Sequence, residues 1–222
     1  MDPRQLLHVQ ASYDQLAAPY AERLSEELKG KPLDRQLLDR FADRVRGEGP
    51  ACDIGCGPGH IARYLHDRGV EICGMDLSAE MVAQARQRHP GIEFRQGDLF
   101  AMDAPNPAWA GIVAFYSLVH IPPADLSRAL RRVLRPSGLL LLAFHVGHEV
   151  VHRDELWGVP VDLDWHFVPT GEMVCHLEAG GFTIGEVIER GPYEGVEHPS
   201  RRAYLFATSP ASSNERPPAS KP

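Results

Sequence analysis

Three glycines at alternate positions, Gly55, Gly57 and Gly59, follow a short apolar run that contains Asp53. Glycine has no Cβ and adopts positive φ at little cost, so a chain with this spacing can turn tightly and bring its backbone N–H groups against a ligand. The helix-like run after Gly59 would point its positive end at the same place. The segment therefore predicts a binding loop for an anionic or polar ligand.

Two further carboxylates follow apolar runs. Asp76 ends the run 70–76 and lies about 20 residues after Gly55, where a βαβ unit places an acid at the tip of its second strand. A carboxylate there can accept hydrogen bonds from both hydroxyls of a ribose. Asp98 has the equivalent position after the run 92–96. Asp76 is therefore a candidate for binding a nucleoside, and Asp98 is a second acid at a strand tip.

Strands and helices must alternate to position these residues. Ser78 is expected to cap a helix after Asp76, and Thr170 another one further along. The segments that we expect to form strands are 51–54, 70–76, 92–96, 110–116, 139–144, 183–189 and 200–208. This order predicts one α/β domain with a sheet between two layers of helices.

The order of these motifs resembles the class I S-adenosylmethionine (SAM) dependent methyltransferases, in their small-molecule branch. Asp53-x-Gly55-x-Gly57-x-Gly59 resembles motif I of that family, and the string LRPSGLLLL at 134–142 resembles the turn into its fifth strand. The resemblance covers roughly residues 12–208. It implies a doubly wound, seven-stranded, mostly parallel sheet with an antiparallel last strand, in a domain 1–208. A helical cap (1–45) would cover the cofactor, and a lid (145–170) the acceptor.

The resemblance implies that S-adenosyl-L-methionine is the cofactor. It assigns the glycine turn to the methionine part of SAM, Asp76 to the ribose and Asp98 to the adenine edge. The residues that it places around the cofactor are Tyr13, Tyr20, Asp53, Gly55, Gly57, Gly59, Asp76, Leu77, Met81, Asp98, Leu99, Tyr116 and Ser117. Tyr13 and Tyr20 are two helical turns apart, so their rings should lie on one face of a covering helix.

On the acceptor side, the candidate catalytic residues are His120, His166 and Asp164. In an extended segment, Asp162, Asp164 and His166 would face the same side. An Asp paired with a His can act as a general base, because the carboxylate fixes the tautomer of the imidazole and raises its basicity. Ordinary core or surface histidines are the alternative for each one.

Two other sequence features, the segment 148–152 and the pair Arg201–Arg202, could be functional or purely structural. Residues 148–152 read H-E-x-x-H, which on a helix binds zinc in metalloproteases, but Gly147 and two adjacent valines make a poor helix. We therefore expect no metal site. Arg201 and Arg202 open the last expected strand, where they would meet a substrate carboxylate or remain a solvated pair.

Composition limits the class of partner. Lys and Arg number 23 against 30 Asp and Glu, a formal net charge of -7, so we expect no nucleic-acid partner. Four cysteines beside expected strands and helices, with no signal or membrane-spanning pattern, predict a cytoplasmic protein. We expect a small-molecule acceptor, a homodimer as the one assembly to test, and a disordered tail at 209–222.

Other functions share parts of this pattern. A nicotinamide-dependent oxidoreductase shares the βαβ opening, but its fingerprint G-x-G-x-x-G would need glycine where His60 stands. A non-catalytic SAM-binding scaffold or sensor would keep the same cofactor motifs. The identity of the acceptor does not follow from any of these residues.

Overall fold

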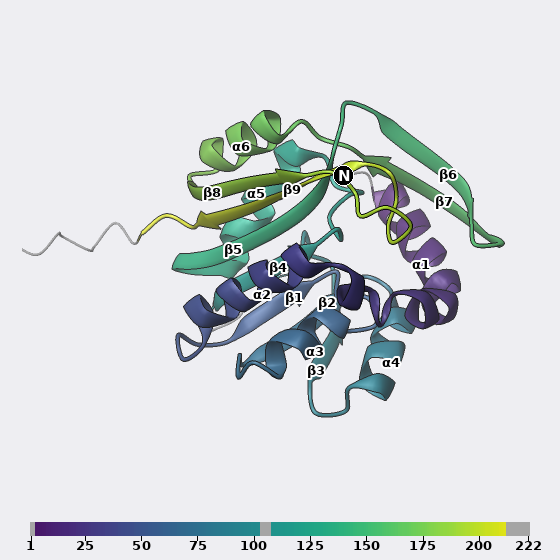
Figure 1. Cartoon of the computed structure of the whole chain (residues 1–222), viewed down its shortest axis with the longest axis horizontal. Coiled ribbons are helices and arrows are strands. Elements are labelled where there is room, and N and C mark those ends of the chain that lie inside the picture. Colours follow the sequence, from purple (N-terminus) through teal and green to yellow (C-terminus); the bar gives the residue numbers. More distant parts are fainter. Residues whose placement is uncertain (1–2, 103–107, 212–222) are drawn as a thin grey trace, which may run out of the picture.

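The computed structural model describes residues 3–102 and 108–211 of the chain (Figure 1). Its main sheet has seven strands in the order β3-β2-β1-β4-β5-β9-β8. Their bounds are β1 Ala51–Ile54, β2 Ile72–Asp76, β3 Glu93–Gln96, β4 Trp109–Phe115, β5 Leu134–Val146, β8 Thr183–Arg190 and β9 Arg201–Thr208. Only β9 runs against the rest, because it pairs antiparallel with both β5 and β8. The predicted doubly wound sheet with an antiparallel last strand is confirmed.

Helices cover both faces of this sheet (Figure 1). On one face, the core joins α2 (Pro32–Val45), α3 (His60–His66) and α4 (Ala79–Arg88) to the strands. On the other face, α5 (Pro123–Val133) and α6 (Thr170–Ala179) pack through Leu130 and Leu177. The central strands are buried on both sides, which explains their continuous apolar runs.

The expected helix caps have different outcomes. Ser78 caps α4 as predicted, since its side chain accepts a hydrogen bond from the N–H of Met81 at 3.1 Å. The prediction for Thr170 is wrong. Pro169 is the N-cap of α6 and Thr170 is its first residue, because a proline with φ of -58° can enter the helix without losing an N–H bond.

A two-stranded antiparallel sheet, β6 (Val150–Leu156) and β7 (Val159–His166), occupies most of the segment predicted as a lid. Trp157 and Gly158 join the strands with φ of 55° and 81°, the signs of a tight hairpin turn. The H-E-x-x-H segment runs into β6, so it lacks the helical turn that brings two histidines together. In the described parts of the chain, no metal-binding group of three side chains forms.

The hairpin β6–β7 packs on α1 (Pro3–Leu24), the long helix that precedes η1 (Glu27–Gly30). Val9 and Leu16 of α1 and Leu163 of β7 form a small buried cluster. Ser12 also accepts a hydrogen bond from the N–H of Asp162 at 2.9 Å. Together, α1 and the hairpin form a second layer beside the main sheet (Figure 1).

The first residues after β9 are hydrogen-bonded to β5, although we expected the disordered tail to begin there. Ser209 donates a hydrogen bond to the carbonyl of Arg135, and its Oγ accepts one from the N–H of Gly138 at 3.1 Å. The expected tail therefore does not begin at Ser209, and residues 212–222 of that prediction lie outside the described residues. Within 3–102 and 108–211, no helix is both long and apolar enough to cross a membrane.

Candidate active site

A cavity of about 690 Å³ opens at the carboxyl ends of the parallel strands and extends under α1 and the hairpin. All residues assigned to the cofactor line it except Gly59. His120 lines it as well, whereas Asp164 and His166 do not. The volume is in the range of small-molecule sites, which is roughly 300–1,000 Å³.

Close packing requires glycine at two positions of the turn. Gly55 has φ of +68°, and a Cβ there would lie 2.3 Å from the Cβ of Ser117. Gly59 has φ of +83° and would place a Cβ 2.7 Å from the ring of Phe94. Gly59 is the N-cap of α3 and packs beneath the loop, so it shapes the turn without facing the cavity.

The amides of the turn do not face a ligand, and this corrects the expectation of an anion-binding loop. The N–H groups of Gly55 and Cys56 both bond to the carbonyl of Met75, at 2.7 and 3.0 Å. The Gly57 N–H donates to Oδ2 of Asp76 at 2.8 Å. These amides hold strand β2 and its carboxylate, so they are unavailable to the pyrophosphate of a dinucleotide.

Carboxylates, and not free backbone amides, line the cavity beside the glycine turn. Asp76 accepts N–H bonds at Oδ2 from Gly57 and at Oδ1 from Ser78 (2.9 Å), which leaves further lone pairs on both oxygens. Burial raises the pKa of Asp76 to about 6. Asp53 accepts from the N–H of Ala62 at 3.1 Å, and burial raises its pKa to about 7.

Asp98 completes the set. It lines the cavity from the β3 side and accepts the N–H of Phe100 at 2.8 Å. The described Lys and Arg side chains that line the cavity, Lys31 and Arg202, come from other elements. Three acids and open lone pairs on Asp76 fit a ligand with ribose hydroxyls and positive charge, which are features of SAM.

Tyr13 and Tyr20 lie on one face of α1, as their spacing predicts. The rings of Tyr13 and Tyr20 lie 6.1 Å apart edge to face, and both line the cavity from α1. The Tyr13 hydroxyl is 2.8 Å from Nε2 of His120, whose Nδ1 is 2.7 Å from the carbonyl oxygen of Asp164. A carbonyl only accepts, so Nδ1 carries the proton and Nε2 accepts the hydroxyl of Tyr13. Burial lowers the pKa of His120 to about 4, which leaves it neutral near pH 7.

The expected pairing of an aspartate with His166 does not form. Oδ1 of Asp164 lies 2.9 Å from Nδ1 of His152 across the hairpin, because those residues are opposite each other in the β6–β7 register. His166 turns toward a small pocket beside α5 and α6, and its Nε2 is buried without a hydrogen-bond partner among the described residues. Of the three candidate catalytic residues, only His120 reaches the cavity.

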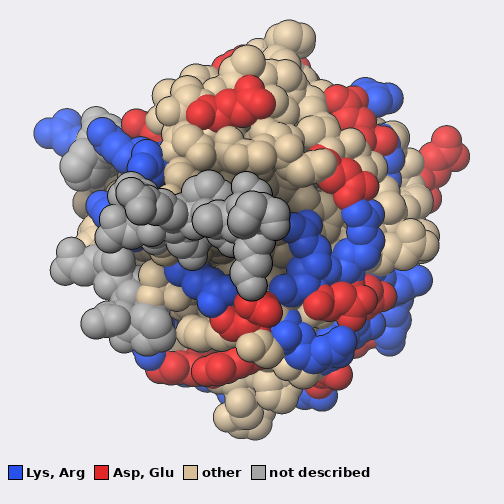
Figure 2. Space-filling model, turned by 90° about the vertical axis from the view of Figure 1, so that its left-hand side faces the viewer, with Lys and Arg blue, Asp and Glu red and all other residues tan. Residues whose placement is uncertain are grey.

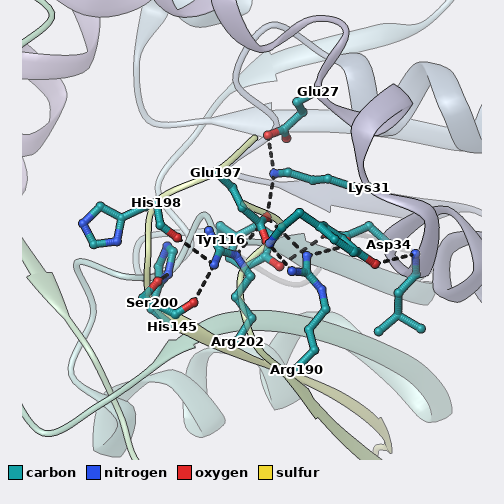
Figure 3. Close-up of polar contacts among 12 residues, drawn as sticks. Glu27, Lys31, Asp34, Tyr116, His145, Arg190, Glu197, His198, Ser200 and Arg202 are labelled. Carbon is teal, nitrogen blue, oxygen red and sulfur yellow. Dashed lines mark hydrogen bonds and ion pairs between the residues drawn. The ribbon is translucent and has the colours of Figure 1, made fainter. Parts of the chain in front are cut away.

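A buried charged cluster runs along the cavity wall, and none of its Lys, Arg, Glu or His side chains is among the assigned site residues (Figure 3). Glu27 lies 2.6 Å from Nζ of Lys31 and 2.9 Å from Nε2 of His60. Nε of Arg202 is 3.1 Å from Oε2 of Glu197. These residues lie up to 175 positions apart, from Glu27 to Arg202, so local spacing gives no signal for the cluster. The one hint was the Arg201–Arg202 pair.

Comparison with known proteins identifies the family. A family model described as a methyltransferase domain matches residues 51–138. A dTDP-3-amino-3,6-dideoxy-alpha-D-glucopyranose N,N-dimethyltransferase from Streptomyces fradiae is 32% identical over 201 residues, which cover 80% of this chain and 73% of that protein. A malonyl-[acyl-carrier protein] O-methyltransferase from Enterobacter lignolyticus is 32% identical over 149 residues, which cover 64% of this chain and 55% of that protein. The match thus spans little more than half of the Enterobacter protein.

Among solved structures, the complex of DhpI with S-adenosylhomocysteine (SAH) is similar, with a TM-score of 0.73 and 22% identity over 95% of this chain and 100% of that one. At this identity the likeness shows the fold. The Streptomyces relative matches over most of its length, and the domain model covers the glycine turn, Asp76 and Asp98. The chain belongs to the class I SAM-dependent methyltransferase family.

Proposed function

We propose that this protein transfers a methyl group from SAM to an oxygen, nitrogen or carbon nucleophile of a small-molecule acceptor. The observation that carries the proposal is the acidic half of the cavity, where the oxygens of Asp76 keep lone pairs for a ribose beside the glycine turn. When bound, SAM supplies an activated methyl group on a sulfonium. The chain must then align the acceptor and exclude water.

Aromatic side chains enclose the cavity, which supports a role for the chain in aligning the acceptor and excluding water. Tyr20 packs on Trp157 with ring centroids 5.8 Å apart, and both residues line the cavity, one from α1 and the other from the hairpin turn. Trp165 and Phe115 add apolar surface. Alignment of the reactants in such a site can lower the activation barrier by about 7–11 kcal/mol, without a protein nucleophile.

The test of the cofactor site is the affinity for SAH, measured by calorimetry. We expect Asp76→Ala to weaken binding more than about tenfold, because the loss of a charge-assisted hydrogen bond to a ribose hydroxyl costs about 1.5–3 kcal/mol. Asp67→Ala is the matched control, since Asp67 is exposed at the end of α3 and pairs with Arg63. Equal affinity of the Asp76→Ala and wild-type proteins would refute the assignment.

For the acceptor, we propose that His120 positions the hydroxyl of Tyr13 in the cavity. A neutral imidazole with its Nδ1 proton on Asp164 presents Nε2 to that hydroxyl, which fixes where the Tyr13 oxygen points. Nitrogen-detected NMR tests this arrangement. We expect His120 to remain the neutral Nδ1–H tautomer down to about pH 5, given its pKa of about 4. A protonation midpoint near 6.5 would contradict the role, and Tyr13→Phe should shift the Nε2 resonance.

The surface and the cysteines support a small acceptor in a reducing compartment. On the face shown in Figure 2, basic and acidic side chains are interspersed. Cys52 and Cys56 are buried free thiols. We propose a cytoplasmic enzyme on this basis, and localisation of a tagged full chain by fractionation would test it.

A further inference from the structure

The charged cluster divides the cavity into two chemically different halves. Asp53 lies in β1, Asp76 ends β2 and Asp98 follows β3, on one side of the sheet order. The Arg202 and Glu197 part of the cluster lies on the other side, where His145 near the end of β5 is in register with Arg202 near the start of β9. The acceptor must occupy this second half if the cofactor occupies the first.

Both carboxylate oxygens of Glu197 are engaged within the cluster. Oε1 of Glu197 accepts hydrogen bonds from Nη1 of Arg190 and from the N–H of Tyr193, the latter at 2.8 Å. Its Oε2 lies 3.2 Å from Nη2 of Arg190, 3.1 Å from Nε of Arg202 and 3.7 Å from Nζ of Lys31. A ligand cation would therefore find no open lone pair on Glu197.

The cations keep free donors. Arg202 uses Nη1 to bond the carbonyls of His198 (3.0 Å) and Ser200 (2.7 Å). Its Nη2 makes no hydrogen bond to any described residue, although Arg202 is only 2% exposed and lines the cavity. Lys31 is 5% exposed and has three N–H donors for two carboxylate partners.

A flat apolar wall connects these donors. Lys31 and Arg202 lie over the ring of Tyr116, at 5.4 and 5.7 Å from its centroid. The ring of His145 stacks on Phe167 at 5.0 Å, and burial lowers its pKa to about 3, so it adds no third cation. The site therefore offers two buried cations with spare donors beside aromatic surfaces.

We propose that this end of the cavity binds a carboxylate of the acceptor through Arg202 and Lys31, so that the acceptor is a small organic acid with an apolar body. The proposal deepens the function proposed above and rests on it. Buried guanidinium groups bind carboxylates through charge-assisted hydrogen bonds, and the aromatic wall covers the rest of the molecule. The alternative is that the cluster only fastens the 191–200 loop to α2.

The experiment compares benzoate with benzamide, which have the same shape and differ in charge. Binding is measured by calorimetry or ligand-observed NMR, with and without saturating SAH. We expect wild-type protein to bind benzoate at least about tenfold more tightly than benzamide. Arg202→Gln should reduce this preference to below about twofold. Arg201→Gln should leave it unchanged, because Arg201 is exposed and pairs with Glu189.

Equal binding of the two probes by the wild type would overturn the proposal, as would equal losses in the two arginine variants. If Arg202→Gln does not fold, judged by its melting temperature, Lys31→Gln provides the second test with the same expected loss of preference. SAH affinity is measured on the same samples. Failure of the wild type to bind SAH would refute the methyltransferase function, while loss of the benzoate preference alone refutes only the carboxylate site.

Discussion

Asp76 is expected to change its charge state near pH 6. Burial raises its pKa to about 6 and that of Asp53 to about 7. Only the ionised carboxylates attract a cationic cofactor, so SAM should bind more tightly as the pH rises. We expect a roughly tenfold loss of affinity from pH 7.5 to pH 5, measured by calorimetry. Asp76→Asn should flatten the dependence of SAM affinity on pH. Tighter binding of SAM at pH 5 than at pH 7.5 would contradict the expected loss of affinity.

The same two pKa values have the opposite effect on the stability of the cofactor-free protein. The folded-state values exceed the ordinary value of 3.8, so the native state binds these protons more tightly than the unfolded chain does. Their contribution to stability is present below about pH 4 and is lost as the pH rises through about 6 and 7. Thermal denaturation with and without SAH, over this range, separates the two effects.

Individual residues differ in how far the sequence reveals them. Asp76 was predictable, because an acid after a short apolar run is placed by the local βαβ geometry. The partners of the turn amides were not, since Gly57 could have donated to a ligand as easily as to Asp76. Arg202 was only a hint, because its burial depends on Glu197 and Lys31.

Among the elements, the hairpin β6–β7 is held in place by its packing on α1. Leu163 is fully buried against Val9 and Leu16. We expect Leu163→Ala to destabilise this contact by about 2–4 kcal/mol. Hydrogen exchange should accelerate in the hairpin and in α1, while the main sheet stays protected.

Leu7→Ala is the control for that variant, because Leu7 is on the same helix and 63% exposed. It should leave exchange in the hairpin unchanged. Uniform acceleration across the main sheet in Leu163→Ala would show instead that the hairpin and sheet unfold as one unit.

The central strands were the easiest elements to predict from the sequence. The strands β4 and β5 are largely buried apolar runs, so composition alone indicates them. The hairpin strands are half exposed, with the burial of β6 varying along its length, so their segment was interpreted only as a lid. The dipeptide Trp157–Gly158 between two alternating runs is the signal that would have indicated a hairpin.

At the scale of the whole molecule, the end of the described chain stabilises the sheet. Ser209 bonds to Arg135 and Gly138, and the carbonyl of Pro210 accepts the N–H of Ser137 at 3.3 Å. A chain ending after Thr208 should therefore be less stable than one ending after Ala211, by about 1–3 kcal/mol in urea denaturation. Equal stability would show that these bonds contribute nothing measurable.

Strand order also fixes when each half of the cavity can form during synthesis. β8 joins the sheet only through β9, which the ribosome makes later. Until then, β8 has no partner and the edge of β5 is open to other strands. The segment that carries the acidic half, 51–99, is made about 100 residues before Arg202. A nascent chain would therefore complete the half lined by Asp53, Asp76 and Asp98 first, and the half lined by Arg202 would form only when β9 inserts.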